Sequence, residues 1–232
     1  MILLGTMAVA LAASPTPDRP TVSRGGYLNA ADTLELEAGP SWQGGSSAVP
    51  ASLEYTVGGA IQPQLGADLA GFDQGVPSLE AGLKIRVLES EEIGLAAFVA
   101  SALPTSDQDP WYGTLAGLIT APLPAEAALT INVGADFSGE PSGGIAFVGV
   151  PVSSAVSTRL WGPVDGFAEI AALLGDDACD GDCSIGHWIF DGGVAIGLTE
   201  ILVVDGALGW DLYAGEPFLS VGLSANFGTL GG

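Results

Sequence analysis

Three consecutive segments within residues 188–227 alternate apolar residues with polar or small ones at a period of two. In the last segment, Leu219, Val221 and Leu223 share one face, and serine and glycine fill the positions between them. Successive side chains of a strand point to opposite faces, so each segment is predicted to be a strand with one apolar face. Because the connections between the segments are short, they predict an antiparallel meander.

The small size of the residues on the polar face indicates what surrounds the sheet. Those positions hold Gly, Ser, Ala, Asn and scattered Asp. The solvent faces of a soluble sandwich are usually richer in long polar side chains. Strands of about ten residues, apolar on one face and small or polar on the other, are typical of a membrane-spanning barrel. We therefore expect lipid on the apolar faces, and a secreted soluble β-sandwich is the less favoured alternative.

Composition supports an all-β chain and excludes one class of partner. The 232 residues fit a single large domain, and the 35 glycines argue against a mainly helical protein, since glycine weakens helix interiors. The chain carries 27 acidic and only 5 basic residues, a net charge of −22. Binding to nucleic acid depends on Lys and Arg that neutralise phosphates, so DNA and RNA are excluded as partners.

The ends of the chain divide it into four predicted parts. Residues 1–13 form an apolar run that ends in small residues, which resembles a secretory signal peptide. Residues 14–32 are predicted to be a periplasmic linker, residues 33–227 a transmembrane barrel, and residues 228–232 a C-terminal tail. No cofactor is expected.

The same alternation continues through the first half of the chain and gives about twelve strands. An even number fits a bacterial single-chain barrel, here an antiparallel up-and-down barrel with short periplasmic turns and longer extracellular loops. Gly58 and Gly59, and Thr199 and Glu200, are predicted to form tight turns. The longer loops are predicted at residues 42–50, 71–77, 104–110, 138–143 and 175–186.

Most aromatic residues gather at one predicted rim. If both termini are periplasmic, the outer rim collects the ends of odd strands and the starts of even ones. An aromatic girdle at the membrane interface is expected there. The predicted girdle consists of Trp42, Phe72, Trp111, Tyr112, Phe137, Trp188, Phe190, Trp210, Tyr213 and Phe218.

A polar loop contains both cysteines and suggests no metal or catalytic centre. Cys179 and Cys183 are predicted to form a small local disulfide, since an even number of cysteines in an exported chain favours one. A metal site would need more ligands than the nearby His187. His187 is also the only histidine, and with Ser184 and Asp191 it forms no evident triad. We expect no enzyme activity.

Charged residues on the inward face are the candidates for function. On the predicted register, the lumen-lining residues are Glu35, Glu37, Glu54, Asp68, Glu80, Lys84, Arg86, Asp136, Asp165, Glu169, Asp191, Asp205 and Asp211. A water-filled lumen with these side chains would concentrate cations and disfavour anions. The alternative is that the acids pair with Lys84 and Arg86 and select nothing. A barrel of this size can be open or filled, and the sequence leaves both open.

Three stretches resemble a known family. They are residues 94–107 (GLAAFVASALPTSD), 190–200 (FDGGVAIGLTE) and 218–227 (FLSVGLSANF), and they resemble outer-membrane barrels named for the meta-pathway of phenol degradation, often described as transporters. The resemblance covers most of the chain after Thr33 and rests on strand and turn patterns. Such barrels commonly end on an aromatic residue that the barrel assembly machinery reads, whereas residues 228–232 follow Phe227 here.

The resemblance and the pattern together predict a location and a function. We expect a barrel in the outer membrane of a Gram-negative bacterium that acts as a passive channel or transporter. Its substrates would be small molecules, and the family name points to hydrophobic or aromatic ones. The alternative is a non-conducting structural or adhesive barrel.

Overall fold

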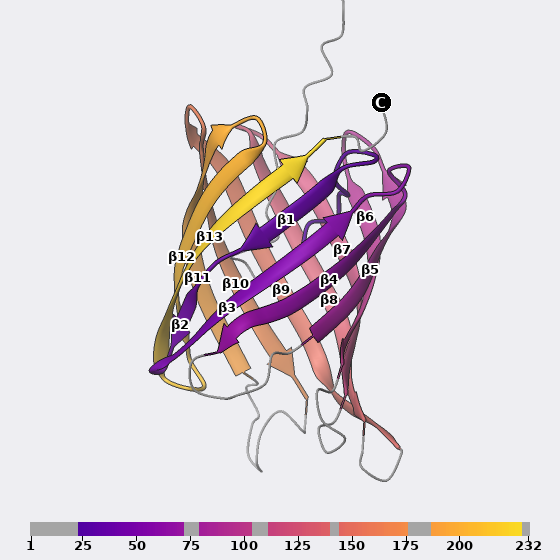
Figure 1. Ribbon diagram of the computed structural model, residues 1–232, viewed down its shortest axis with the longest axis vertical. Helices are drawn as coiled ribbons and strands as arrows, with labels where there is room; N and C mark the ends of the chain where they lie inside the picture. Colours follow the sequence, from indigo (N-terminus) through magenta and orange to yellow (C-terminus); the bar gives the residue numbers. More distant parts are fainter. Residues whose placement is uncertain (1–22, 72–78, 104–110, 140–143, 176–186, 229–232) are drawn as a thin grey trace, which may run out of the picture.

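A closed antiparallel barrel makes up the described part of the chain. The computed structural model describes residues 23–71, 79–103, 111–139, 144–175 and 187–228. Their strands form one sheet that closes on itself (Figure 1). No helix among these residues is long and apolar enough to cross a membrane. The strands are β1 (Leu34–Ala38), β2 (Ser41–Gln43), β3 (Ser46–Tyr55), β4 (Ile61–Gly71), β5 (Leu79–Glu89), β6 (Gly94–Leu103), β7 (Tyr112–Leu123), β8 (Ala127–Gly139), β9 (Ile145–Trp161), β10 (Val164–Leu174), β11 (His187–Thr199), β12 (Leu202–Asp211) and β13 (Glu216–Phe227).

The first two strands together make one wall element of a twelve-stranded barrel. β1 and β2 both pair with β13 on one side and with β3 on the other. Between them, the amide of Gly39 donates to the carbonyl oxygen of Pro50 (3.1 Å), and the carbonyl oxygen of Pro40 accepts from the amide of Val221 (3.0 Å). The ladder therefore continues across the break, and the predicted number of strands is confirmed.

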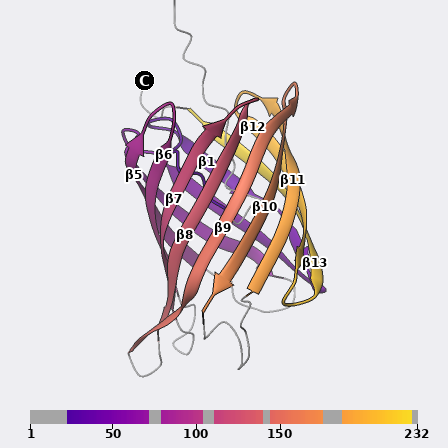
Figure 2. The ribbon, with the colours of Figure 1, turned by 180° about the vertical axis from the view of Figure 1, so that it is seen from behind.

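The two ends of the barrel differ in the length of their connections. At one end, tight turns join β3 to β4 at Gly58 and Gly59, β7 to β8 at residues 124–126, and β11 to β12 at residues 200–201. The opposite end has the connections 72–78, 104–111, 140–144 and 175–186. Figure 2 shows the consecutive strands β5 to β12 running between these two ends. Short turns on one side and longer loops on the other confirm the predicted architecture, with the short turns assigned to the periplasm.

One predicted loop is wrong. Residues 42–50 were expected to leave the barrel as a Gly/Ser loop, but Trp42 pairs with Ser47 in a β2–β3 hairpin. Gly44 (φ 57°) and Gly45 (φ 85°) form its two-residue turn, in the left-handed region that such hairpins require. Pro50 lies at a register shift between β3 and β4, where a missing amide donor is tolerated. Pairing on both sides therefore overrides the low strand propensity of this stretch.

The burial of the wall is reversed relative to a soluble protein. On β13, Leu219, Val221 and Leu223 are 41–46% exposed, whereas Ser220 and Ser224 on the opposite face are 6% and 1% exposed. Large apolar side chains are exposed in the same way around the barrel, for example Leu65 (56%) and Leu208 (64%). A surface of this kind is stable only when hydrocarbon covers it. The predicted alternation and its facing are confirmed.

The prediction of a periplasmic linker at residues 14–32 is wrong for the described residues from Ser23 onward. Residues 14–22 lie outside the described residues, but residues 23–29 run inside the barrel, and the exposed residues 30–32 form the turn that leads into β1. Gly26 lies against the wall so closely that an added Cβ would be 2.4 Å from the carbonyl oxygen of Gly94. Leu28 packs on a buried cluster that contains Phe98 and Leu118. We call residues 23–33 the N-terminal segment.

The outward register gives a test of membrane insertion. Val221 lies near the middle of β13 and faces outward, so Val221→Arg should destabilise the barrel by roughly 2–4 kcal/mol in lipid vesicles. Urea titrations of folding into vesicles would measure this. Leu212→Arg is the control, because Leu212 is 56% exposed just beyond the end of β12, and its cost should be about 0–1 kcal/mol. Equal costs for the two variants would contradict the assigned depth.

Candidate functional site in the barrel lumen

The predicted lumen-lining residues fall into two groups by burial. At most 9% of the surface of each member of the first group is exposed; these are Glu35, Glu37, Glu54, Lys84, Glu169, Asp191, Asp205 and Asp211. The second group is half-buried and comprises Asp68, Glu80, Arg86, Asp136 and Asp165. Their apolar neighbours along the strands are exposed, so the charged side chains lie on the concave side of the wall. Whether they select solutes stays a prediction.

Cross-strand pairing brings several of these acids next to each other. Glu35 of β1 lies directly opposite Glu54 of β3, and Glu169 of β10 lies directly opposite Asp191 of β11. Amide side chains donate to the first pair, because Asn29 donates to Glu35 and Gln62 donates to Glu54. Such donors offset the repulsion between buried carboxylates.

Of the two predicted cations on β5, Lys84 is buried, and Arg86 forms an ion pair with Glu89 (2.6 Å) near the periplasmic turn.

The N-terminal segment is bound to the wall by polar groups at its start. The amide of Ser23 donates to Oε1 of Glu169 (2.5 Å), and its hydroxyl also donates to that oxygen. The hydroxyl groups of Ser23 and Ser153 are hydrogen-bonded at 2.8 Å. The amide of Gly26 donates to the hydroxyl of Thr120 (2.8 Å). These bonds tie the segment to β7, β9 and β10.

Arg24 connects the segment to the opposite side of the barrel. Its Nη1 donates to Oε1 of Gln64 (2.9 Å), and its Nη2 lies 3.6 Å from Oε1 of Glu80. The guanidinium carbon lies 4.5 Å from the ring centroid of Phe98, which is a cation–π contact. Arg24 therefore places a positive charge near the middle of the lumen.

The end of the segment reaches the periplasmic rim. The hydroxyl of Tyr27 donates to the carbonyl oxygen of Ser90 in the β5–β6 turn (3.4 Å). Burial raises the pKa of the Tyr27 phenol, and the negative charge of Glu89 raises this pKa further. Tyr27 therefore stays neutral across the physiological pH range.

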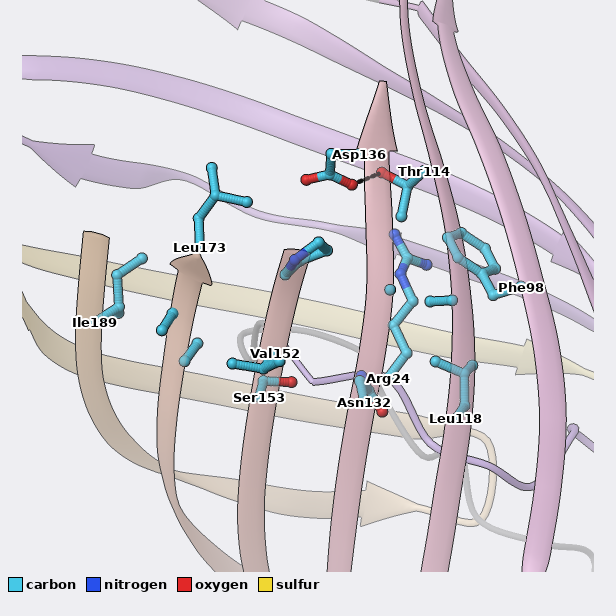
Figure 3. A pocket seen from close by; sticks show the side chains of 15 residues that line it. Arg24, Phe98, Thr114, Leu118, Asn132, Asp136, Val152, Ser153, Leu173 and Ile189 are labelled. Carbon is cyan, nitrogen blue, oxygen red and sulfur yellow. Dashed lines mark hydrogen bonds between the residues drawn. The ribbon is translucent and has the colours of Figure 1, made fainter. Parts of the chain in front are cut away.

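Two cavities lie on the two sides of the N-terminal segment. The first has a volume of about 220 Å³ and faces the extracellular side; Figure 3 shows Arg24 beside Phe98, with Thr114 and Asp136 near the guanidinium. Its lining is mostly apolar, with Leu118, Val152, Leu173 and Ile189 among the wall residues. The second has a volume of about 280 Å³, faces the periplasmic side and includes Glu54, Gln62 and Lys84. We call them the outer cavity and the inner cavity.

Few polar groups enter the outer cavity. The hydroxyl of Thr114 donates to Oδ1 of Asp136 (2.7 Å), and Asn132, Ser153 and Arg24 supply the remaining polar side chains. An apolar wall with a small number of placed polar groups is the usual composition of a small-molecule site. The inner cavity is more polar and holds the buried Lys84.

The predicted aromatic girdle is only partly at the outer surface. Trp42, Phe190, Trp210 and Tyr213 are 43–56% exposed near the loop end. The ring of Trp111 lies close to Gly113 and Gly139, Phe137 packs edge-on against Phe147 with ring centroids 6.0 Å apart, and Trp188 is half-buried. Phe72 lies outside the described residues.

Two members of the girdle face the interior instead. Phe218 shares a face with the buried Ser220, and its ring lies over Gly209 on the inner side of β12. Tyr112 shares a face with Thr114 and the buried Leu118, so it lies at the mouth of the lumen. A position at the start of a strand predicted the rim correctly, but only the register decides the face.

The remaining predicted residues lie mostly outside the described part of the chain. Cys179 and Cys183 lie outside the described residues, and only the backbone of His187 can be placed, opposite Leu173. Among the described residues, no three His, Cys, Asp or Glu side chains are grouped so that they could hold a metal ion.

Several site residues were missed by the sequence analysis. Arg24 was placed in a linker, and Phe98 lay in a stretch of uniform apolar character whose facing was ambiguous. Gln62 and Gln64 alternate with apolar residues on β4, so the strand pattern already placed them on the inner face. Only their lack of charge kept them out of the predicted set.

Comparisons with known proteins support the fold. No family model and no curated protein matches the chain. Among solved structures, the KdgM porin in complex with oligogalacturonate has a TM-score of 0.67 at 8% identity, covering 83% of this chain and 99% of that one. The NanC porin has a TM-score of 0.65 at 6% identity, covering 82% and 98%. An outer-membrane channel from Pseudomonas putida F1 has a TM-score of 0.63 at 15% identity, covering 89% and 100%. The chain has the fold of an outer-membrane porin barrel.

Packing of Leu28 should control the docking of the N-terminal segment. Leu28→Ala removes a buried side chain from the cluster with Phe98 and Leu118, so it should weaken docking by about 2–3 kcal/mol. Hydrogen exchange of the backbone amides in residues 24–30 would measure the loss of protection. Leu36→Ala is the matched control, since Leu36 is 41% exposed on the outer face. If Leu36→Ala raised exchange in the segment as much as Leu28→Ala, the docking role of Leu28 would be wrong.

Proposed function

We propose that this protein is a passive channel for small molecules in the outer membrane of a Gram-negative bacterium. The observation that carries the proposal is the unfilled interior. Two cavities of about 220 and 280 Å³ lie inside a barrel whose outer surface is apolar. The fold shared with porins supports the same function. The proposed partners are the lipid of the outer membrane, small solutes and the barrel assembly machinery.

The charge of the lumen favours cations. Buried carboxylates lie on β1, β3, β10, β11 and β12, whereas the cations on the inner side among the described residues are Arg24, Lys84, Arg86 and Arg159, the last paired with Asp165. A passage with an excess of one charge raises the local concentration of the opposite ions. The similar porin KdgM was solved with oligogalacturonate, which is a polyanion. The acidic interior of this chain is unsuited to such a ligand, and we do not propose it.

The lining of the outer cavity favours partly apolar solutes. Phe98, Leu118 and Val152 form its wall, and polar groups are few. Small aromatic or hydrophobic molecules would gain from burial there. This agrees with the resemblance to barrels of the phenol meta-pathway, which remains a proposal for this chain.

The N-terminal segment would be the constriction of the channel. It separates the two cavities, because Arg24 lines the outer one and Gly25, Tyr27 and Asn29 line the inner one. A solute that crosses must pass beside the segment or displace it. The same observation favours the second candidate function, a non-conducting barrel whose interior is closed by this segment.

Measurement of ion conduction tests the proposed function directly. The purified barrel in planar bilayers should carry current, and the reversal potential in a KCl gradient should show preference for K⁺ over Cl⁻ because the lumen is acidic. The double variant Glu35→Gln with Glu54→Gln should reduce that preference. Anion preference would contradict the acidic lumen, and the absence of both current and solute uptake into liposomes would favour the non-conducting barrel.

A reversible crosslink tests the constriction. Ser23→Cys and Ser153→Cys replace hydroxyl groups that are 2.8 Å apart, so their sulfurs can form a disulfide of about 2.05 Å. Cys179 and Cys183 would be changed to Ser to avoid exchange. If the segment must move, oxidation should lower the conductance and a reducing agent should restore it. The same preparation before and after reduction is its own control, and equal conductance in both states would show that solutes pass without moving the segment.

A further inference from the structure

Four neighbouring strands place a chemically distinct row of side chains at one level of the inner wall. Glu169 of β10 pairs directly with Asp191 of β11, Asp191 pairs with Gly209 of β12, and Gly209 pairs with Phe218 of β13. Neighbouring strands lie about 4.8 Å apart, so the two carboxylates and the aromatic ring are adjacent. The row combines two adjacent acidic side chains with an aromatic ring.

Asp191 is buried beside another acid and receives no hydrogen bond from an N–H or hydroxyl group among the described residues. It is 9% exposed, and the side-chain partner of its carboxylate oxygens is the carboxyl group of Glu169. Glu169, by contrast, is 5% exposed and accepts from both the amide and the hydroxyl of Ser23. A buried carboxylate that lacks a donor costs stability, typically by several times the net value of a hydrogen bond. A cation supplied from outside the chain would remove this cost.

The ring of Phe218 is held beside Asp191 because the position between them is glycine. A Cβ at Gly209 would lie 2.2 Å from Cζ of Phe218 and 2.7 Å from Cβ of Asp191. Any other residue would push the ring away from this place. An aromatic ring next to a carboxylate can bind an ammonium group through charge and cation–π attraction.

The row lies next to the outer cavity. Ala171 and Ile189, which pair with each other two positions along from Glu169 and Asp191, both line this cavity. Its volume is about 220 Å³. A dry apolar cavity of about 150 Å³ in another protein takes up benzene. A molecule with one ring is therefore small enough for the cavity, whose wall at Ala171 and Ile189 adjoins the row.

We propose that Glu169, Asp191 and Phe218 bind the ammonium group of a small organic amine whose single ring or short alkyl chain lies in the outer cavity. The inference rests on the proposed channel function only for the route by which the amine enters. A metal ion is a poorer match, because the described residues offer no group of three ligands there. An amine needs only the carboxylates and the ring.

Equilibrium binding of benzylamine to the folded barrel in detergent tests this site by calorimetry. Asp191→Asn should weaken binding at least about tenfold, since a contact between charged groups is lost. Phe218→Leu should weaken it by a smaller factor. Asp205→Asn is the matched control: it removes a buried acid from the same wall, roughly 13 Å along β12 from Gly209, and should change the affinity much less. Benzoate and toluene should bind more weakly than benzylamine.

Four outcomes decide the proposal. Equal affinity of the wild type and Asp191→Asn, equal losses in Asp191→Asn and Asp205→Asn, or benzoate binding as tightly as benzylamine would each overturn it. So would competition by K⁺ at the concentration of the amine, because the site would then hold inorganic cations.

Stability and transport provide independent readouts. Asp191→Asn should raise the urea midpoint of unfolding, because it removes a buried charge that lacks a donor; a purely structural Asp191 would give a lower midpoint and overturn the inference. Benzylamine binding without conduction would remove the channel function and leave this site standing. Conduction without benzylamine binding would overturn this site and leave the channel function standing.

Discussion

The pairing of every backbone amide and carbonyl group in the wall is the constraint on which the rest of the structure depends. Hydrocarbon offers no hydrogen bonds, so an open sheet edge facing lipid would be too costly. The seam between β1, β2 and β13 meets this constraint in spite of the break at residues 39–40. The carbonyl oxygen of Pro40 still accepts from Val221, although Pro40 itself has no amide to donate. Closure at this seam allows the outer face to be apolar and concentrates polar side chains inside.

The concentration of acids inside creates a second requirement, which the N-terminal segment helps to meet. Carboxylates buried on a narrow inner face need donors, and the segment supplies the amide and hydroxyl of Ser23 to Glu169 and the amide group of Asn29 to Glu35. Arg24 adds a positive charge, with its Nη2 3.6 Å from Oε1 of Glu80. Docking of the segment and stability of the acidic wall are therefore coupled, so displacement of the segment would expose these carboxylates to water or to a passing cation.

The period-two pattern was sufficient to predict the barrel, the number of its strands and the side that faces lipid, because lipid outside makes burial alternate strictly with position. It was insufficient where tertiary pairing decides the outcome. Residues 42–50 form a hairpin because β13 and β4 offer partners on both sides, and no local propensity indicates that. The N-terminal segment carries no strand pattern, so its place inside the lumen depends on contacts with distant residues such as Thr120 and Glu169. Phe218 was assigned to the correct rim and the wrong face.

The interior charges are distributed unevenly around the lumen, and this gives the two cavities different chemistry. Lys84 and Arg86 both lie on β5, and Arg24 reaches the same side through Gln64 and Glu80. Of the buried acids, Glu169, Asp191 and Asp205 lie across the barrel on β10 to β12, whereas Glu35, Glu37 and Glu54 lie on β1 and β3, and Glu54 lines the inner cavity together with Lys84. Near the outer cavity, Arg24 on one side and Glu169 and Asp191 on the other would orient a solute that has one charged and one apolar end. Because Phe98 and Leu118 line the outer cavity beside Arg24, the apolar end would be held against β6 and β7 while a positive group turns toward the acids.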